Sequence, residues 1–477
     1  MTEKGHHTIN KQILKINIDS DVDAFQTQQK ISDLFKNQVI PQLSDFFDFL
    51  SPVDSFHLID KLEINVGKIN NINKDFVENS VNAIKNKLQE KINEFKETGI
   101  KSNENDLNET KIPFLIFINF VETGTFPWWA ENISVSNLET QIKDSVKNSH
   151  EKFFETVENY CKNNVLRKRI VLQFSADFIE WLIINFEERI INPQTPSIIN
   201  DFRNLLSTIN SLGISSANNY MDIIFDLLLK NLSKKKSYTL KNESIYKEIQ
   251  REIVSIENKN ANISDNKKSE LLQKKLSEII QNNFTKNIFK ESETAEALNL
   301  SEDIIELQKN NIESIHIENS GLIILWQFLP ELFKNLGYTK DNKFISEIKQ
   351  EQAIGLTDYM VYKETEIPEY RILLNKIICG WNIEIPVKRK FHFSAKEKKE
   401  IKDFLKSIIT HWSALKNTSI EGLQKSFLNR KGKLSKIKSG WLLVVERNSY
   451  DVLLDMLPWS TNTVKLPWMQ EHINTEW

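Results

Sequence analysis

The sequence contains too few glycines and cysteines to form the common motifs of catalysis and metal binding. Its 477 residues include 12 glycines, all of them standing singly, and 2 cysteines. A phosphate-binding glycine loop, a dinucleotide fingerprint and the HExxH, GxSxG and CxxC patterns are therefore absent. Cys161 and Cys379 lie too far apart for a closely spaced zinc site, and so few cysteines are typical of the reducing cytosol. We expect no enzyme, no catalytic residue, no cofactor and no metal.

Strong net charge and long apolar runs are absent as well. The formal net charge is −3, whereas nucleic-acid-binding domains are usually strongly basic. The two most apolar stretches, 113–121 and 321–333, are shorter than the ~20 residues of a membrane-spanning helix. The first residues lack the apolar core of a signal peptide. We therefore expect a cytoplasmic protein that does not bind nucleic acid and is not stably inserted into a membrane.

The middle of the chain lacks the residues that break helices. No glycine occurs at 214–320 and no proline at 197–329, and apolar residues recur there at helical spacing. The apolar faces are narrow, which predicts long helices that are exposed, or partly disordered, in the free protein. The total length exceeds what one hydrophobic core usually serves, and it indicates about three domains or an elongated molecule.

The N-terminal region shows two different periods. Apolar residues alternate at 9–18 and again at 56–66, which predicts two strands, and they follow helical spacing at 21–50, with Pro41 as a kink. A helix between two strands provides a crossover long enough for parallel pairing. A further amphipathic helix is predicted at 74–98.

The C-terminal region combines helices and strands. Apolar residues at steps of three and four mark one helical face at 401–415, and a short helix is predicted at 419–427. The apolar run 441–445 is of strand type, and 463–466 is a candidate partner for it. We expect an α+β region here.

Tryptophan is concentrated in the same region. Five of the ten tryptophans lie within 411–477, and the tripeptide Leu-Pro-Trp occurs twice, at 457–459 and 466–468. Proline restricts its own backbone and that of the preceding residue, so each tripeptide is a rigid extended step that presents one indole. Each indole either fills the core of its own domain or packs on a partner protein. An aromatic corner, Phe-Pro-Trp-Trp at 126–129, leaves the same two options open.

The candidate residues for the core or for partner binding are mainly these aromatic steps. Glu446 and Arg447, which follow the apolar run, are interpreted as a structural ion pair at a strand end. The full set is Trp128, Trp129, Trp412, Trp441, Glu446, Arg447, Leu457, Pro458, Trp459, Leu466, Pro467, Trp468 and Trp477.

The order of motifs near the C-terminus resembles a known family. The segments 414–423, 426–434 and 440–447, with Asp451 and the two Leu-Pro-Trp steps, resemble the C-terminal region of the contractile injection system tape measure family of bacterial phage-tail-like particles. The resemblance extends to the segment of Gly124 to Trp129, to 321–338, 352–353, 368–370 and 374–381, and to N-terminal residues around His7, Asp60 and Gly67. It fades in the middle.

This resemblance implies a non-enzymatic assembly protein that sets tube length and joins tube-end components. Its expected partners are the tube, baseplate, tip or cap proteins of the particle, with self-association left open. The protein would be made in the cytoplasm and carried inside the particle. An alternative is a cap or end adaptor of the same particle. A third alternative, ranked lower, is a particle-borne enzyme that acts on peptidoglycan or as a toxin.

These observations together predict a mainly α, elongated chain with a small α/β N-terminal unit and a Trp-rich α+β C-terminal region, joined by long helices. The expected divisions are a strand-helix-strand unit at 1–72, a helical region with the aromatic corner at 73–231, a polar helical linker at 232–316 and the family-like region at 317–477.

Overall fold

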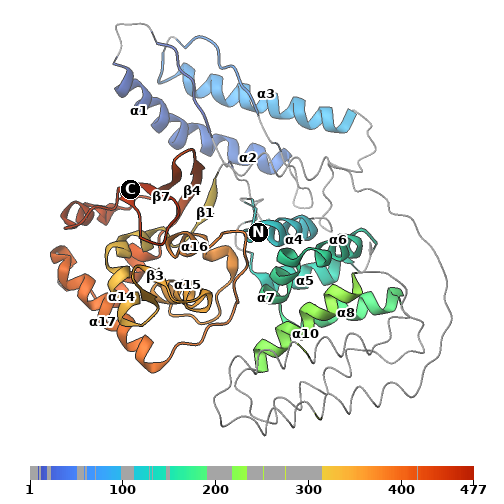
Figure 1. The fold of residues 1–477 in the computed structure, drawn as a ribbon. Helices are drawn as coiled ribbons and strands as arrows, with labels where there is room; N and C mark the ends of the chain where they lie inside the picture. Colours follow the sequence, from blue (N-terminus) through green and yellow to red (C-terminus); the bar gives the residue numbers. More distant parts are fainter. Residues whose placement is uncertain are drawn as a thin grey trace. The chain divides into compact units, whose positions relative to one another are not determined.

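A computed structural model describes the following residues: 9, 12–18, 23–50, 59, 62–69, 71–97, 112–127, 129–130, 133–146, 151–190, 217–233, 251, 274, 314–415 and 417–477. The described residues are mainly helical, and a sheet lies near the C-terminus, as the sequence predicts (Figure 1). They fall into two units. Unit 1 is Met1–Ile116 with Trp128–Glu131 and Gln141–Asn148, and unit 2 is Phe117–Pro127, Asn132–Thr140 and Ser149–Trp477.

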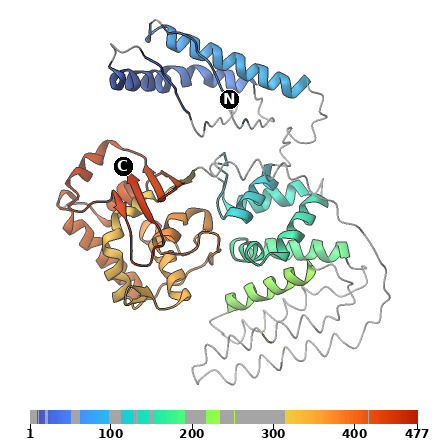
Figure 2. The ribbon, with the colours of Figure 1, turned by 45° about the horizontal axis from the view of Figure 1, so that its top comes forward.

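Unit 1 is built from two long helical stretches (Figure 2). The first consists of α1 (Ala24–Leu34), a π-helical turn η1 (Phe35–Val39) and α2 (Ile40–Leu50). Asp23 begins it by accepting hydrogen bonds from the backbone N–H groups of Phe25 and Gln26, at 2.9 and 3.1 Å. Pro41 cannot donate a backbone hydrogen bond, and the wider π turn lies directly before it. Pro41, where the sequence predicts a kink, lies in the first turn of α2.

The second stretch, α3 (Asp75–Glu97), confirms the helix predicted at 74–98. Apolar residues spaced by about one helical turn form the shared core of unit 1. These buried residues are Ile31, Phe35, Val39 and Leu43 on the first stretch and Phe76, Val77, Val81 and Ile84 on α3.

The two strands predicted in this region are wrong for the residues that the structure describes. Residues 12–18 and 62–69 have no regular secondary structure. Alternation favours a strand only where a neighbouring strand accepts its hydrogen bonds and covers one face. In 12–18, Ile13, Leu14, Ile16 and Ile18 are all exposed, so no face is covered. In 62–69, Ile64 and Ile69 pack against the helices of unit 1, but the segment pairs with no strand among the described residues. Phe56 and Leu58 lie outside the described residues.

Unit 2 begins with helices that share an aromatic core. The helices are α4 (Ile112–Thr123), whose second half belongs to this unit, α5 (Val135–Val146), likewise shared, α6 (Glu151–Lys162), α7 (Asn164–Gln173), α8 (Ala176–Ile190) and α10 (Ala217–Leu232). Neighbouring rings have centroids 5.0–6.4 Å apart, within the range of favourable aromatic pairs. The rings belong to Phe117, Phe120, Phe153, Phe154, Phe174, Phe178, Trp181 and Phe186.

The rest of unit 2 is the C-terminal domain, residues 314–477. Its helical elements are η2 (Ser320–Phe328), α14 (Leu329–Asn335), α15 (Glu347–Tyr362), η3 (Glu369–Arg371), α16 (Leu373–Ile378), α17 (Ala395–His411), η4 (Ser413–Leu415), α18 (Ile420–Leu423), η5 (Gln424–Leu428) and η6 (Ser449–Met456). The elements α17 with η4, and α18 with η5, confirm the helices predicted at 401–415 and 419–427. Ser394 and Glu397 begin α17 with a reciprocal capping box.

A five-stranded sheet of order β1-β4-β5-β7-β6 completes this domain. Its strands are β1 (Ile315–Ile317), β4 (Gly432–Ile437), β5 (Gly440–Val445), β6 (Thr463–Val464) and β7 (His472–Glu476); β2 (Thr339–Lys340) and β3 (Lys343–Phe344) form a separate hairpin. The strand predicted at 441–445 is β5. Its predicted partner, 463–466, is wrong: β6 pairs with β7, because β7 occupies the edge of β5 in parallel register.

The long helices predicted in the middle fall on residues outside the described part of the chain. Residues 251 and 274 are described there, and both are helical.

Candidate functional site

A buried arginine on α7 joins the helices of unit 2 to the C-terminal domain. Asn163 begins α7 by accepting hydrogen bonds from two backbone N–H groups, and Arg169 follows on this helix with its side chain fully buried. Its Nε donates to Glu369 Oε2 at 3.0 Å. Its Nη1 donates to the carbonyls of Val121 and Glu122, at 2.6 and 3.1 Å. These carbonyls belong to the last turn of α4, where a helix lacks donors of its own and favours a cation.

The same carboxylate also binds a buried lysine. Lys376 Nζ on α16 donates to Glu369 Oε1 and to the carbonyls of Ile383 and Ile385, at 3.1 and 2.9 Å. Burial lowers the pKa of Lys376 from its ordinary value, and the charge of Glu369 opposes this shift. Two cations therefore share one carboxylate, and carbonyl oxygens accept their remaining hydrogen bonds. We name Arg169, Glu369, Lys376 and Gln173 the charged joint.

Gln173, at the end of α7, extends the charged joint with neutral hydrogen bonds. Its side-chain oxygen accepts from the backbone N–H of Glu369 at 2.8 Å, and its Nε2 donates to the Val387 carbonyl at 2.7 Å. Arg389 Nη1 donates to the backbone carbonyl of Gln173 at 2.9 Å. Buried amide groups are costly without such partners. Gln173 thereby fixes the segment around Glu369 and Val387 against α7.

A glycine lets the two chain segments approach. Gly124 follows α4 with φ +76°, in the left-handed region, and confirms the helix end predicted there. A Cβ on Gly124 would lie 2.8 Å from Glu369 Oε1, so any larger residue would displace the carboxylate. Phe126 stacks on Tyr370 with ring centroids 4.5 Å apart. Two segments that carry the family resemblance, Gly124 to Pro127 and Pro368 to Tyr370, are thus in contact.

A second buried arginine holds the end of the C-terminal domain together. Arg430 binds both carboxylate oxygens of Asp451, at 2.9 and 3.1 Å, a geometry that suits the guanidinium fork. The Trp477 indole N–H also donates to Asp451, at 3.2 Å. Burial alone would raise the pKa of Asp451, but the hydrogen bonds from Arg430 and from the Asn448 backbone hold it below its ordinary value.

Both Leu-Pro-Trp steps direct their indoles into the C-terminal domain. Trp459 Nε1 donates to the Ile324 carbonyl at 2.9 Å, and its ring meets Phe328 edge-on at 4.8 Å. Trp468 Nε1 donates to the Ile378 carbonyl at 2.8 Å, and its ring lies 5.7 and 5.0 Å from those of Phe333 and Phe344. Leu466 is buried and Leu457 half-buried, whereas Pro458 and Pro467 are exposed.

The other candidate residues have varied surroundings. Trp412 is fully buried and donates to the Leu453 carbonyl at 3.0 Å, and Trp441 is buried in the sheet. Trp129 and Trp477 are half-buried, and Trp128 lies outside the described residues.

Glu446 and Arg447 form no ion pair with each other in the structure. Both side chains are exposed, and Arg447 donates instead to the Trp477 carbonyl at 2.7 Å. Consecutive residues at the end of a strand point to opposite faces, which explains why the ion pair expected from the sequence does not form.

Sequence reasoning did not find the charged joint. One signal was present, because Arg169 directly precedes the apolar run of Ile170 to Leu172 on a short helix, and a charge within an apolar stretch is often buried and paired. Glu369 lies in a segment that carries the family resemblance, but nothing local marks it as the partner of Arg169.

The described residues include no group of three or more histidine, cysteine or acidic side chains placed to hold a metal ion. Both cysteines are buried; burial raises the pKa of Cys161 to about 12 and also raises that of Cys379, so neither thiol is an activated nucleophile. Within the same described part of the chain, no helix combines the length and apolar character needed to cross a membrane.

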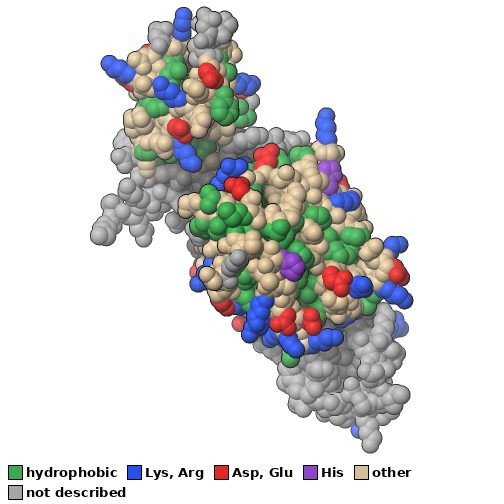
Figure 3. All heavy atoms as spheres, turned by 90° about the vertical axis from the view of Figure 1, so that its left-hand side faces the viewer, with side chains coloured by type: hydrophobic (Ala, Val, Ile, Leu, Met, Phe, Trp, Pro, Cys, Tyr) green, Lys and Arg blue, Asp and Glu red, His purple; other side chains and the backbone are tan. Residues whose placement is uncertain are grey.

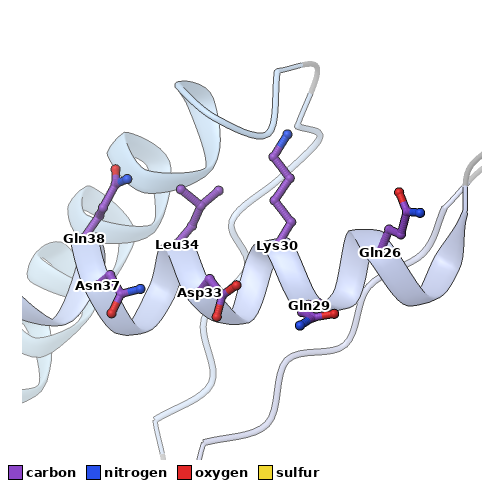
Figure 4. A pocket seen from close by; sticks show the side chains of 7 residues that line it. All are labelled: Gln26, Gln29, Lys30, Asp33, Leu34, Asn37 and Gln38. Atoms are coloured by element: carbon purple, nitrogen blue, oxygen red, sulfur yellow. The ribbon is translucent and has the colours of Figure 1, made fainter.

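An open hollow of about 390 Å³ lies on the outer face of α1 and η1. Figure 4 shows that its lining side chains all project from this one helical stretch: Gln26, Gln29, Lys30, Asp33, Leu34, Asn37 and Gln38. A single helix encloses no ligand, and six of these seven side chains are exposed. The hollow is the polar face of an amphipathic helix.

The chain was compared with curated proteins, solved structures and protein-family models. No curated protein and no solved structure matches the chain. The family model described as contractile injection system tape measure protein matches residues 6–477. The match includes Arg169, Arg430 and both Leu-Pro-Trp steps. The chain therefore belongs to the contractile injection system tape measure protein family, which has a structural role in particle assembly.

Proposed function

We propose that this chain sets tube length during particle assembly, and that its C-terminal domain joins it to a tube-end component. The observation that supports this proposal is that the C-terminal domain is held together by its own hydrogen bonds. Trp412, Trp459 and Trp468 all give their indole N–H groups to carbonyls of the same domain. A length-setting chain must be held at an end, and a domain that is already folded loses little conformational entropy when it binds.

Because these three indole N–H groups are bonded within the domain, we place the binding surface on other residues. Figure 3 shows hydrophobic side chains exposed on one face of the molecule. Exposed apolar side chains are suited to bind a partner protein. The short helix η6 has no buried residue, and its Val452 and Met456 are 65% and 61% exposed. Its opposite side is held firmly, since Arg430 binds Asp451 and Trp412 donates to the Leu453 carbonyl. We assign the contact with the tube-end component to Val452 and Met456.

The double variant Val452→Ser with Met456→Gln tests this contact. Losing two buried apolar contacts costs roughly 3 kcal/mol, or roughly a 100-fold weaker affinity. We expect the variant to fold normally and to co-sediment poorly with assembled tubes. Ile348→Ser is the matched control, because Ile348 is 72% exposed on α15. Normal co-sedimentation of the double variant, or an equal loss with the control, would remove η6 as the contact.

Length control is tested by omitting the chain. Particles assembled without it should lack tubes or should have a broad distribution of tube lengths in negative-stain images. Particles assembled with it should have one narrow length. A narrow, unchanged distribution in its absence contradicts the proposal. Co-purification of the chain with complete particles would support its being carried inside them after assembly in the cytoplasm.

The alternative is a cap or end adaptor, and one observation favours it. The C-terminal domain and the helices α6, α7 and α10 belong to one folded unit, and a folded body can occupy a tube end without measuring length. A longer variant distinguishes the two roles. If the chain is an adaptor, an insertion at any position leaves tube length unchanged. If the chain sets tube length, an insertion at one or more positions makes the tube longer.

A further inference from the structure

The residues on either side of 234–313 belong to the same folded unit. The helix α10 ends at Leu232, two positions before this segment, and β1 begins at Ile315, two positions after it. Both elements are part of unit 2. The contacts that hold each of them can be followed residue by residue.

The preceding end is held through α10 and α7. Arg167 on α7 binds Asp226 on α10 through two hydrogen bonds, of 2.8 and 3.2 Å, and Ile224, Phe225 and Leu228 are buried. The charged joint, two residues further along α7, then holds this helix against the C-terminal domain through Arg169 and Glu369. The chain therefore enters the segment from a helix attached to that domain.

The following end is held inside the C-terminal domain. Strand β1 pairs antiparallel with β4, with Ile315 opposite Leu434 and Ile317 opposite Gly432. Two residues later, Asn319 donates to Asn375 at 2.7 Å and the Ser320 hydroxyl donates to the Arg430 carbonyl at 2.6 Å. The chain therefore leaves the segment into the same folded body.

We infer that residues 234–313 are an insertion within one folded unit and not a spacer between two, so that length added there is not transmitted to the tube. The expected effect on tube length rests on the proposed length-setting function. The structural part, that 234–313 is an insertion within unit 2, does not. Both ends of such a segment are attached to the same folded unit. Making the segment longer therefore does not change the distance between the sites at which that unit binds its neighbours.

Cutting the full chain within the insertion tests the structural part. A recognition site for a specific protease is placed after Asn262, and the purified protein is cleaved completely. We expect the two fragments to co-elute in size-exclusion chromatography at the position of the uncut chain, because the charged joint and its hydrogen bonds hold them. Separation of the fragments under native conditions overturns the inference.

The charged joint is then weakened in the cleaved protein. Glu369→Gln leaves Arg169 and Lys376 without their shared charge, and it should cause the fragments to separate. The matched control is Glu364→Gln, which removes an exposed carboxylate that pairs with Arg371 and should leave them associated. If Glu369→Gln prevents the C-terminal domain from folding, Arg169→Gln tests the same contact from α7. Continued co-elution of both joint variants overturns the role of the joint.

Tube length tests the functional part. A helical insert of about 28 residues, ~42 Å long at about 1.5 Å per residue, is placed after Asn262. We expect this variant to assemble tubes of unchanged length. Longer tubes from this variant overturn the inference. If particles assembled without the chain keep a narrow, unchanged tube length while the cleaved fragments stay together, the proposed length-setting function fails and the structural inference stands.

Discussion

The guanidinium of Arg169 and the carboxylate of Glu369 are 3.0 Å apart, although 200 positions separate them in the sequence. Their side chains are 0% and 1% exposed. The free-energy cost of removing two charges from water offsets most of the attraction between them. Breaking a buried ion pair, however, leaves an uncompensated charge inside the protein. The pair therefore specifies which surfaces meet more than it adds to total stability.

Neutralising Glu369 should be strongly destabilising. Glu369→Gln keeps the shape of the side chain and leaves two buried cations unpaired, for an expected loss of ~3–5 kcal/mol in the free energy of unfolding. Glu364→Gln, at a carboxylate that is 55% exposed, should cost less than ~1 kcal/mol. Urea denaturation of both variants measures the difference. Similar losses would mean that the buried carboxylate is no more important than a surface one.

The two Leu-Pro-Trp indoles should both be needed for a stable C-terminal domain. Trp459→Ala and Trp468→Ala each remove a large packed ring, and each should lower the free energy of unfolding by ~3–5 kcal/mol. The phenylalanine variants keep most of the ring but leave a carbonyl unpaired, so a loss of ~1–3 kcal/mol is expected. Pro467→Ala, at an exposed side chain, is the control. Wild-type stability of either alanine variant would place that indole outside the core.

Gly321 and Gly337 should respond very differently to alanine. A Cβ on Gly321 would lie 1.6 Å from the carbonyl oxygen of Phe427, whereas a Cβ on Gly337 would meet nothing within 4 Å. Gly321→Ala forces two backbone segments apart, and we expect a loss of at least ~3 kcal/mol or no soluble protein. Gly337→Ala strains only its own backbone, at φ +69°, for about 1–2 kcal/mol. Near-UV circular dichroism and thermal unfolding would show whether this order holds.

Asp222 on α10 should reduce stability at alkaline pH. Burial raises its pKa from 3.8 to about 7; Lys390 opposes this shift and Glu351 adds to it. Between these two pKa values the native state binds the proton more tightly than the unfolded state, so stability falls as the pH rises. Asp222→Asn should therefore melt at a higher temperature than the wild type at pH 8, and the advantage should disappear near pH 4. A difference in melting temperature between Asp222→Asn and the wild type that stays constant with pH would contradict the expected burial cost.

Local patterns predicted the helices well and the long-range contacts poorly. The limits of α3 could be predicted to within one residue because its apolar spacing ends at a polar segment, and the aromatic density of 411–477 marked a folded domain. Residues 12–18 show the weakness of alternation, since a strand also needs a partner that a single segment does not reveal. The contact of Arg169 with Glu369 had no local signal at either end. The insertion of β7 between β5 and β6 was missed for the same reason.

The position of β7 also has a consequence for synthesis. This strand, His472–Glu476, comes last in sequence among the strands of the described residues but lies between β5 and β6 in the sheet. A growing chain on the ribosome therefore carries an incomplete sheet until these residues have been added. We expect a chain that stops before His472 to leave the edge of β5 without its parallel partner and β6 without its antiparallel one.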